Sequence, residues 1–233
     1  QHRTVGFEAL ARWPSPPLGP VSPAQFIPIA ERAGIIGGLT RTLLKKALHA
    51  ASTWPDKMRL SFNLSAQDLN SPEAVMAVIA IIENSPFDAE RLDLEITETA
   101  FIHDTRQAKQ SVEMLRKIGC GISLDDFGTG YSSLTALHSL PLTKIKIDQS
   151  FVNQIQDNPA SEKIVHSVLT LGREMGLDAI VEGVETQQEL SLITQLGGNF
   201  FQGYLFSPPM GETAILRFLQ DEEQALGSRL SNG

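Results

Sequence analysis

Alternation of two kinds of segment constrains the fold of this chain more than any other feature of its sequence. Short segments rich in β-branched and apolar residues alternate with longer segments of helical periodicity. This pattern predicts a largely parallel sheet covered by helices. No linker or low-complexity tract divides the chain, so we expect one domain spanning residues 1–233. The strand-like segments are Val5–Arg12, Arg59–Leu64, Arg91–Thr97, Gly121–Asp126, Leu142–Ile147, Asp178–Gly183 and Asn199–Leu205.

Helical periodicity fills the gaps between these strands. Ser71 is the expected N-cap of a helix that starts at Pro72, and Thr186 forms a capping box with Glu189. Each strand is therefore followed by a helix, as a β–α repeat requires. The expected helices are Pro23–Arg32, Leu39–Trp54, Pro72–Asn84, Thr105–Ile118, a shorter one near Ser132–Ser139, Ser161–Met175, Thr186–Leu196 and Glu212–Leu226.

An open doubly wound sheet and a closed barrel both satisfy this alternation. The open sheet usually carries a glycine-rich phosphate loop after its first strand, and no such loop follows the first strand here. We therefore favour the α/β class and a (β/α)8 barrel of the TIM type. Only seven strands are apparent, so we expect the remaining strand upstream of Gln1, in a longer protein of which this chain is a fragment.

Polar residues lie near the C-terminal end of all seven strand-like segments. In a (β/α)8 barrel these ends meet at one rim, where the active sites of the fold are built. Each residue taken singly also fits a solvated strand face or a turn, but their recurrence on successive strands favours a site. The residues are Glu8, Asn63, Glu95 and Glu98, Asp125 and Asp126, Lys146 and Asp148, Glu182 and Glu185, and Gln202.

Divalent cations are the expected counter-ions of this cluster. Buried carboxylates repel one another and resist desolvation, and one lysine cannot neutralise so many. Oxygen ligands without a supporting histidine or cysteine suit Mg²⁺ or Mn²⁺ better than Zn²⁺. Adjacent carboxylates at Asp125 and Asp126 suit two ions, and two ions about 3.5–4 Å apart recur where a phosphorus centre is attacked in line.

Composition narrows the classes of partner. The formal net charge is −8, so we expect no DNA-binding surface, although metal ions can still attract a phosphorylated ligand. No apolar run approaches the length of a membrane span. The single cysteine, Cys120, excludes an internal disulfide and indicates a reducing compartment. We expect its thiol to be buried and structural rather than nucleophilic.

The residues at the strand ends also belong to short motifs that resemble the signature of a known family. Each motif alone is weak, but together they occur in family order and spacing over essentially the whole chain. The chain is similar to the EAL domains of bacterial cyclic di-GMP signalling. The motifs are Glu8-Ala9-Leu10 within Gly6–Trp13, Asn63-Leu64-Ser65, Glu95-Ile96-Thr97-Glu98, Asp125–Leu134, Lys144–Asp148, Glu182-Gly183-Val184-Glu185 and Gln202–Phe206.

The resemblance implies two ions, Mg²⁺ or Mn²⁺, in each site. Asp125 would bridge them, and Asp126 and Glu182 would also hold the second ion, directly or through water. The ligands implied for the first ion are Glu8, Asn63, Glu95 and Asp125.

The other site residues match positions that act on water or on the ligand. Lys146 matches the lysine that orients or helps to deprotonate the attacking water, and Gln202 matches a residue that positions water or the second ion's shell. Glu98 matches the glutamate that anchors the loop after Asp126. Arg12 matches the arginine that contacts a ligand phosphate through its bidentate guanidinium. The resemblance also places three residues beside the substrate or in support of the site, namely Leu10, Asp148 and Glu185.

The activity implied is hydrolysis of one phosphodiester bond of cyclic di-GMP, which yields linear pGpG in the cytoplasm. Family members commonly dimerise through the segment that corresponds to Phe127–Leu137, so we expect a homodimer. Sensor or cyclase domains often flank such domains. Members also carry an upstream strand with a Gln-Pro-Ile pattern, antiparallel to the first strand here, and this strand with its ligand-contacting glutamine is missing from the sequence.

Two alternatives stand beside the enzyme. A non-catalytic receptor would bind cyclic di-GMP and signal by conformation, but receptors of this family usually lose several metal ligands, and none is lost at the positions compared. A barrel aldolase would use Lys146 as a Schiff base, but the surrounding carboxylates would keep that lysine protonated. The sequence therefore favours the phosphodiesterase.

Overall fold

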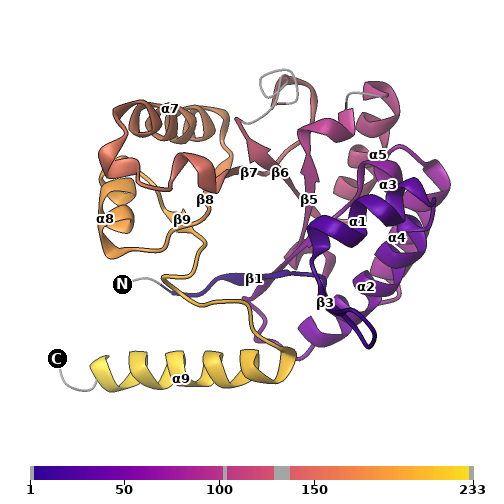
Figure 1. Ribbon diagram of the computed structural model, residues 1–233, viewed down its shortest axis with the longest axis horizontal. Helices are drawn as coiled ribbons and strands as arrows, with labels where there is room; N and C mark the ends of the chain where they lie inside the picture. Colours follow the sequence, from indigo (N-terminus) through magenta and orange to yellow (C-terminus); the bar gives the residue numbers. More distant parts are fainter. Residues whose placement is uncertain (1–2, 102–103, 129–136, 231–233) are drawn as a thin grey trace.

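The computed structural model describes residues 3–101, 104–128 and 137–230 of the chain. Seven strands form one sheet in the order β1-β4-β5-β6-β7-β8-β9, and all neighbouring strands are parallel. The sheet curls into a barrel-like arrangement with helices outside it (Figure 1). The predicted parallel sheet of seven strands is thus confirmed. The strands are β1 (Gly6–Ala9), β4 (Arg59–Asn63), β5 (Leu92–Thr97), β6 (Gly121–Phe127), β7 (Lys144–Ile147), β8 (Asp178–Val181) and β9 (Phe200–Phe201).

The helices of the outer layer begin and end close to the predicted positions. Ser71 caps its helix by accepting a hydrogen bond from the backbone N–H of Ala74, and the capping box of Thr186 and Glu189 is formed. No helix among the residues that the structure describes is long and apolar enough to cross a membrane. The main helices are α1 (Pro23–Arg32), α2 (Ile36–Ala51), α3 (Ala66–Leu69), α4 (Pro72–Glu83), α5 (Thr105–Lys117), α7 (Pro159–Met175), α8 (Gln187–Gln195) and α9 (Glu212–Leu230).

Short 3-10 helices line several connections, and one predicted helix is only partly covered by the structure. Most of the helix expected near Ser132–Ser139 lies outside the described residues, and residues 137–139 are helical. The 3-10 helices are η1 (Ala89–Arg91), η2 (Glu98–Phe101), η3 (Gln149–Phe151) and η4 (Ile155–Asp157).

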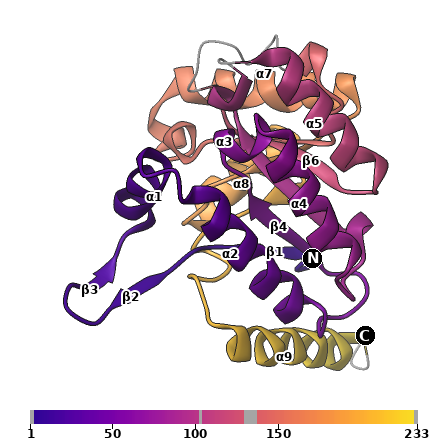
Figure 2. The same cartoon turned by 90° about the vertical axis from the view of Figure 1, so that its right-hand side faces the viewer.

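The first strand is shorter than the predicted Val5–Arg12, because the chain leaves the sheet after Ala9. It then forms an antiparallel hairpin of β2 (Trp13–Ser15) and β3 (Gly19–Val21), which projects from the barrel together with α1 (Figure 2). This hairpin was not predicted. Prolines crowd the segment, and because proline cannot donate to a ladder it is tolerated only at sheet edges such as this one.

The two faces of the curled sheet differ in polarity. Successive strand residues point to opposite faces, and the outward residues form the apolar core under the helices. Cys120, just before β6, is also fully buried, as expected. The outward core residues Leu60, Leu94, Leu124, Ile145 and Val181 are at most 1% exposed.

The inward face carries a charged network at the N-terminal ends of the strands. Arg59 donates from Nε and Nη2 to the two carboxylate oxygens of Asp93, both at 2.7 Å, and Lys144 Nζ donates to Asp93 Oδ2 at 2.6 Å. A Cβ at Gly121 would collide with the Asp93 carboxylate. The glycine on β6 is therefore what makes room for this buried carboxylate between β4 and β7.

We expect Asp93→Asn to lower the free energy of unfolding by about 3 kcal/mol, because it leaves two cations facing a neutral amide in a buried setting. Urea denaturation followed by circular dichroism measures this loss. The exposed Asp56 provides the control, and a similar loss in Asp56→Asn and Asp93→Asn would contradict a structural role for the network.

Candidate metal centre

Lys146 lies at the centre of the candidate site. It points inward from β7, and its side chain is 1% exposed. Its Nζ lies 2.7 Å from Glu182 Oε1, 2.8 Å from Glu95 Oε2, 3.2 Å from Asp125 Oδ1 and 3.6 Å from Glu8 Oε2. The parallel register places these carboxylates on the same inward face of the sheet, so four strand ends converge on one ammonium group. We call these five side chains the carboxylate ring.

Two amides hold the Glu8 carboxylate in this ring. Asn63 Nδ2 donates to Glu8 Oε1, and Gln202 Nε2 donates to Glu8 Oε2, both at 2.7 Å. Glu8 lies on β1 and Gln202 follows β9, the strands at the two edges of the sheet. The Gln202–Glu8 hydrogen bond therefore joins the two edges of the sheet at the mouth of the barrel.

Asp126 joins the site through an irregularity in β6. In a regular strand the side chains of Asp125 and Asp126 would point to opposite faces. The pairing of β6 with β7 shifts register between Leu124 and Phe127, and Asp126 has a left-handed φ of 54°. Oxygen atoms of Asp125, Asp126 and Glu182 consequently lie within 4.8 Å of one another. Strained backbone of this kind is characteristic of functional sites.

The donor set fits divalent cations. One ammonium faces four carboxylates, and Glu95 Oε1 is buried without a hydrogen-bond partner among the described residues. A buried carboxylate oxygen without a partner is costly, and a bound cation would remove that cost. The charged side chains that could ligate a metal all offer carboxylate oxygens, which are the ligands that hard cations prefer.

Burial and mutual repulsion shift the protonation of the ring. Burial raises the pKa of Glu95 to about 8 and that of Glu182 to about 7, with further contributions from the charges of Glu8 and Asp125. Lys146 opposes both shifts. Burial alone would lower the pKa of Lys146, but the surrounding carboxylates raise it above its ordinary value. Near neutral pH the ring therefore keeps its ammonium charged and holds additional protons on its carboxyl groups.

Glu98 and Asp148 lie beside the end of β6, which carries the paired aspartates. Glu98 begins η2, and its Oε1 accepts a hydrogen bond from the backbone N–H of Gly128 at 3.4 Å. The anchoring role predicted for Glu98 requires such a contact. Asp148 caps η3 by accepting from the Ser150 N–H at 3.0 Å. Burial, Asp125 and Asp148 all raise the pKa of Asp126.

Three predicted substrate-binding residues lie apart from the ring. Leu10 is 45% exposed, and the exposed Arg12 donates from Nη1 to the backbone carbonyl of Ala11. Glu185 is exposed, and its backbone N–H donates to Glu189 Oε2. Among the described residues no hydrogen bond or ion pair joins these three side chains to Lys146, so their roles stay predictions.

Sequence reasoning missed Ser123. It lies on the inward face of β6, two residues before Asp125, and is paired in register with Glu95. Its hydroxyl is buried and has no hydrogen-bond partner within the described part of the chain. The period-two spacing from Asp125 was the signal that placed it on the same face.

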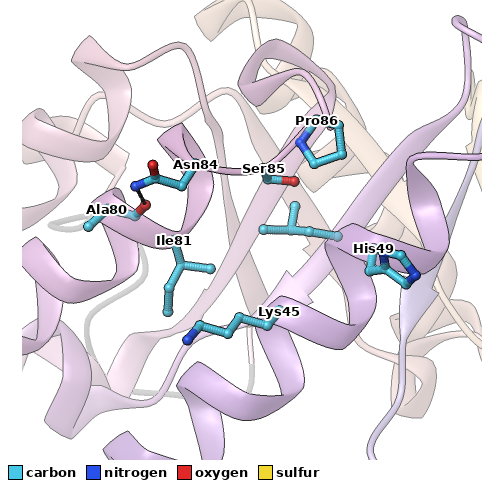
Figure 3. A pocket seen from close by; sticks show the side chains of 8 residues that line it. Lys45, His49, Ala80, Ile81, Asn84, Ser85 and Pro86 are labelled. Atoms are coloured by element: carbon cyan, nitrogen blue, oxygen red, sulfur yellow. Dashed lines mark hydrogen bonds between the residues drawn. The ribbon is translucent and has the colours of Figure 1, made fainter.

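A shallow groove among the described residues lies away from the ring. It has a volume of about 470 Å³, and its walls come from α2 and α4, with Lys45 and His49 facing Ile81 and Asn84 (Figure 3). None of its lining residues belongs to the carboxylate ring, and none is acidic. This groove is therefore not the metal centre.

Comparison with known proteins identifies the family. The EAL domain family profile matches residues 1–209. The chain belongs to the EAL domain family. This EAL domain is 35% identical over 214 residues to the cyclic di-GMP phosphodiesterase PdeR of Escherichia coli, a match that covers 91% of the chain and 32% of PdeR. It is 39% identical over 218 residues to the uncharacterized protein y4lL of Sinorhizobium fredii, covering 94% and 26% of the two chains.

Solved structures show the same fold. The PaMucR phosphodiesterase in complex with c-di-GMP superposes with a TM-score of 0.85 at 35% identity, over 91% of this chain and 87% of that one. The EAL enzyme Bd1971 bound to cAMP and cyclic di-GMP superposes with a TM-score of 0.88 at 32% identity. The match covers 92% of this chain and 60% of Bd1971. The EAL domain thus has the predicted TIM-like fold. It spans 26% of the length of y4lL and 32% of PdeR.

The raised pKa values predict how stability depends on pH. Glu95 and Glu182 bind protons more tightly in the folded protein than in the unfolded chain, where the glutamate pKa is 4.5. The stability linked to these protons is complete below that value and is lost as pH rises through about 7 and about 8. With a chelator present, we expect the free energy of unfolding to fall between about pH 5 and pH 8.

Urea titrations at several pH values measure this fall. Glu95→Gln removes one of the two titrating groups while keeping the shape of the side chain, so its fall should be smaller than that of the wild type. Equal slopes in the two proteins would contradict the assignment.

Proposed function

We propose that this EAL domain hydrolyses cyclic di-GMP to linear pGpG. The observation that carries the proposal is the carboxylate ring, in which carboxylates from four strand ends lie within 3.6 Å of Lys146 Nζ. Similarity to PdeR, which is named a cyclic di-GMP phosphodiesterase, supports the reaction. Similarity to PaMucR, solved in complex with c-di-GMP, supports the substrate.

Two ions, Mg²⁺ or Mn²⁺, are the proposed cofactors. We assign Asp125 to both ions, and Asp126 and Glu182 to the second ion. The proximity of these three carboxylates supports the assignment. Bound cations of this kind lower the pKa of water and offset the charge that develops on the phosphoryl oxygens. The proposed ligands of the first ion are Glu8, Asn63, Glu95 and Asp125.

Lys146 acts on the attacking water by orienting it. An ammonium group has three N–H donors, and the surrounding carboxylates favour this charged form by raising the lysine pKa. Its positive charge also favours the approach of a phosphodiester to an otherwise acidic site. Gln202 contributes by holding Glu8, and Glu98 by holding the backbone after the aspartate pair at Gly128.

The cellular setting follows from the family resemblance and stays a prediction. We propose a cytoplasmic homodimer that acts within a longer signalling protein. A relative 36% identical to this chain, MucR of Pseudomonas aeruginosa, is named a bifunctional diguanylate cyclase and cyclic di-GMP phosphodiesterase, which supports fusion to a cyclase domain. Residues 129–136 of the expected dimer segment, Phe127–Leu137, lie outside the described residues.

Turnover is tested by incubating the protein with cyclic di-GMP and Mg²⁺ or Mn²⁺ and separating the products by chromatography. We expect pGpG from the wild type. We expect Glu8→Ala and Asp125→Ala to lower the rate by at least about a hundredfold, because each removes a ligand that the other side chains cannot replace.

Cys120→Ala is the matched control. Its thiol is buried in the core, and burial raises the thiol pKa to about 12. Cys120 has no role in the proposed mechanism, so turnover should be nearly intact. Appreciable activity in Glu8→Ala would overturn the ligand assignment. Binding of cyclic di-GMP without turnover by the wild type would instead favour the receptor.

A further inference from the structure

The short helix η3 lies between two loops that directly follow ligands of the proposed second ion, one at the end of β6 and one after Glu182. On one side, a Cβ at Gly128 would lie only 3.0 Å from Phe151 Cε2. On the other side, a Cβ at Gly183 would collide with the Cβ of Gln149. Gly128 lies two residues after Asp126, and Gly183 directly follows Glu182. The backbones of both loops are therefore pressed against the same helical turn.

Both glycines have backbone angles that disfavour any other residue. The φ angles are 98° at Gly128 and 69° at Gly183, in the region that residues with a Cβ rarely adopt. The close approach and the left-handed backbone together require glycine at both positions. η3 thus packs directly against the backbone at both positions.

Three features make η3 a firm support. It follows β7 directly, and Asp148 caps its first turn through the Ser150 N–H. Val152 and Ile155, which follow it, are fully buried, and the ring of Phe151 packs against the hydrophobic core. Gly128 is therefore held from two directions, by the Phe151 ring and by its N–H···Oε1 hydrogen bond to Glu98.

We infer that Phe151 is a positioning residue for the cation held by Asp125, Asp126 and Glu182. Its ring packs against the backbone at Gly128, two residues after Asp126, and so helps to set the distance at which the three carboxylates meet. This inference rests on the proposed function, since it assumes that a cation occupies this group. The two glycines that η3 contacts lie nearest in sequence to Asp126 and Glu182, which belong to the proposed second ion alone, so the effect of Phe151 should fall mainly on that ion.

Mn²⁺ binding to the whole chain tests the inference directly, by isothermal titration calorimetry and by electron paramagnetic resonance. We expect two Mn²⁺ ions in the wild type. Phe151→Ala should weaken one of them by about 10–100-fold, the usual effect of losing a group that supports metal ligands, and should weaken the other, which shares only Asp125 with it, much less. Asp126→Asn should weaken the same ion. Phe151→Leu retains much of the packing and should give an intermediate affinity.

Phe87→Ala is the matched control for lost core packing. Phe87 is 3% exposed and precedes η1 at the far end of β5 from the ring. It should lower the melting temperature at least as much as Phe151→Ala while leaving both Mn²⁺ affinities unchanged.

Two results would overturn the inference alone: unchanged Mn²⁺ binding in Phe151→Ala and Phe151→Leu, or an equal loss of one ion in Phe87→Ala. A wild type that binds no Mn²⁺ would overturn the proposed metal site as well as this inference.

Discussion

The burial of Lys146 among four carboxylates is the interaction on which the rest of this structure depends. An ammonium group buried to this degree is tolerated only when it is paired, and here it is paired to side chains from β1, β5, β6 and the end of β8. The four carboxylates in turn exceed what one positive charge can balance. The ring is therefore stable around Lys146 and still has capacity for cations, which is the combination that a metal-dependent hydrolase needs.

The barrel supports this ring with a second charged layer. Arg59 and Lys144 both form ion pairs with Asp93. Asp93 and Lys144 lie two residues before Glu95 and Lys146 on their strands, and Arg59 lies four residues before Asn63. Two successive inward layers of complementary charge fix which residues of each strand face inward, because a slip of one residue would turn both layers outward. The apolar residues between them are then directed to the helices, so the register that builds the core also builds the site.

Much of this arrangement could be predicted from the sequence, because the C-terminal ends of parallel strands share one edge of the sheet. Glu8, Glu95, Asp125 and Glu182 were each placed in the site on that ground. The direction of the Lys146 side chain was harder to predict, because its alternation with Ile145 and Ile147 fits a solvent-exposed face equally well. Only its partners on other strands show that it points into the barrel. Asp126 depends on a register shift and a left-handed φ that no local pattern specifies. The hairpin of β2 and β3 escaped prediction because its prolines are typical of a loop.

The packing of η3 against Gly128 and Gly183 shows how the positions of the carboxylates in such a site can be fixed. Carboxylates on separate strands meet only if the loops beyond them are held, and small residues at Gly128 and Gly183 let η3 approach both loops closely. If these loops are already fixed, binding of a cation costs less conformational entropy, because its ligands need not be ordered at that step. On the proposed role of Phe151, packing at Gly128 helps to maintain the left-handed backbone of Asp126.

Anomalous X-ray diffraction from crystals grown with Mn²⁺ tests the two-ion site most directly. If the carboxylate ring is a bimetal centre, two anomalous peaks should lie within it. One should contact Glu8, Glu95 and Asp125, and the other Asp125, Asp126 and Glu182. Crystals with no peak inside the ring, or with Mn²⁺ bound only at other surface carboxylates, would contradict the proposed centre.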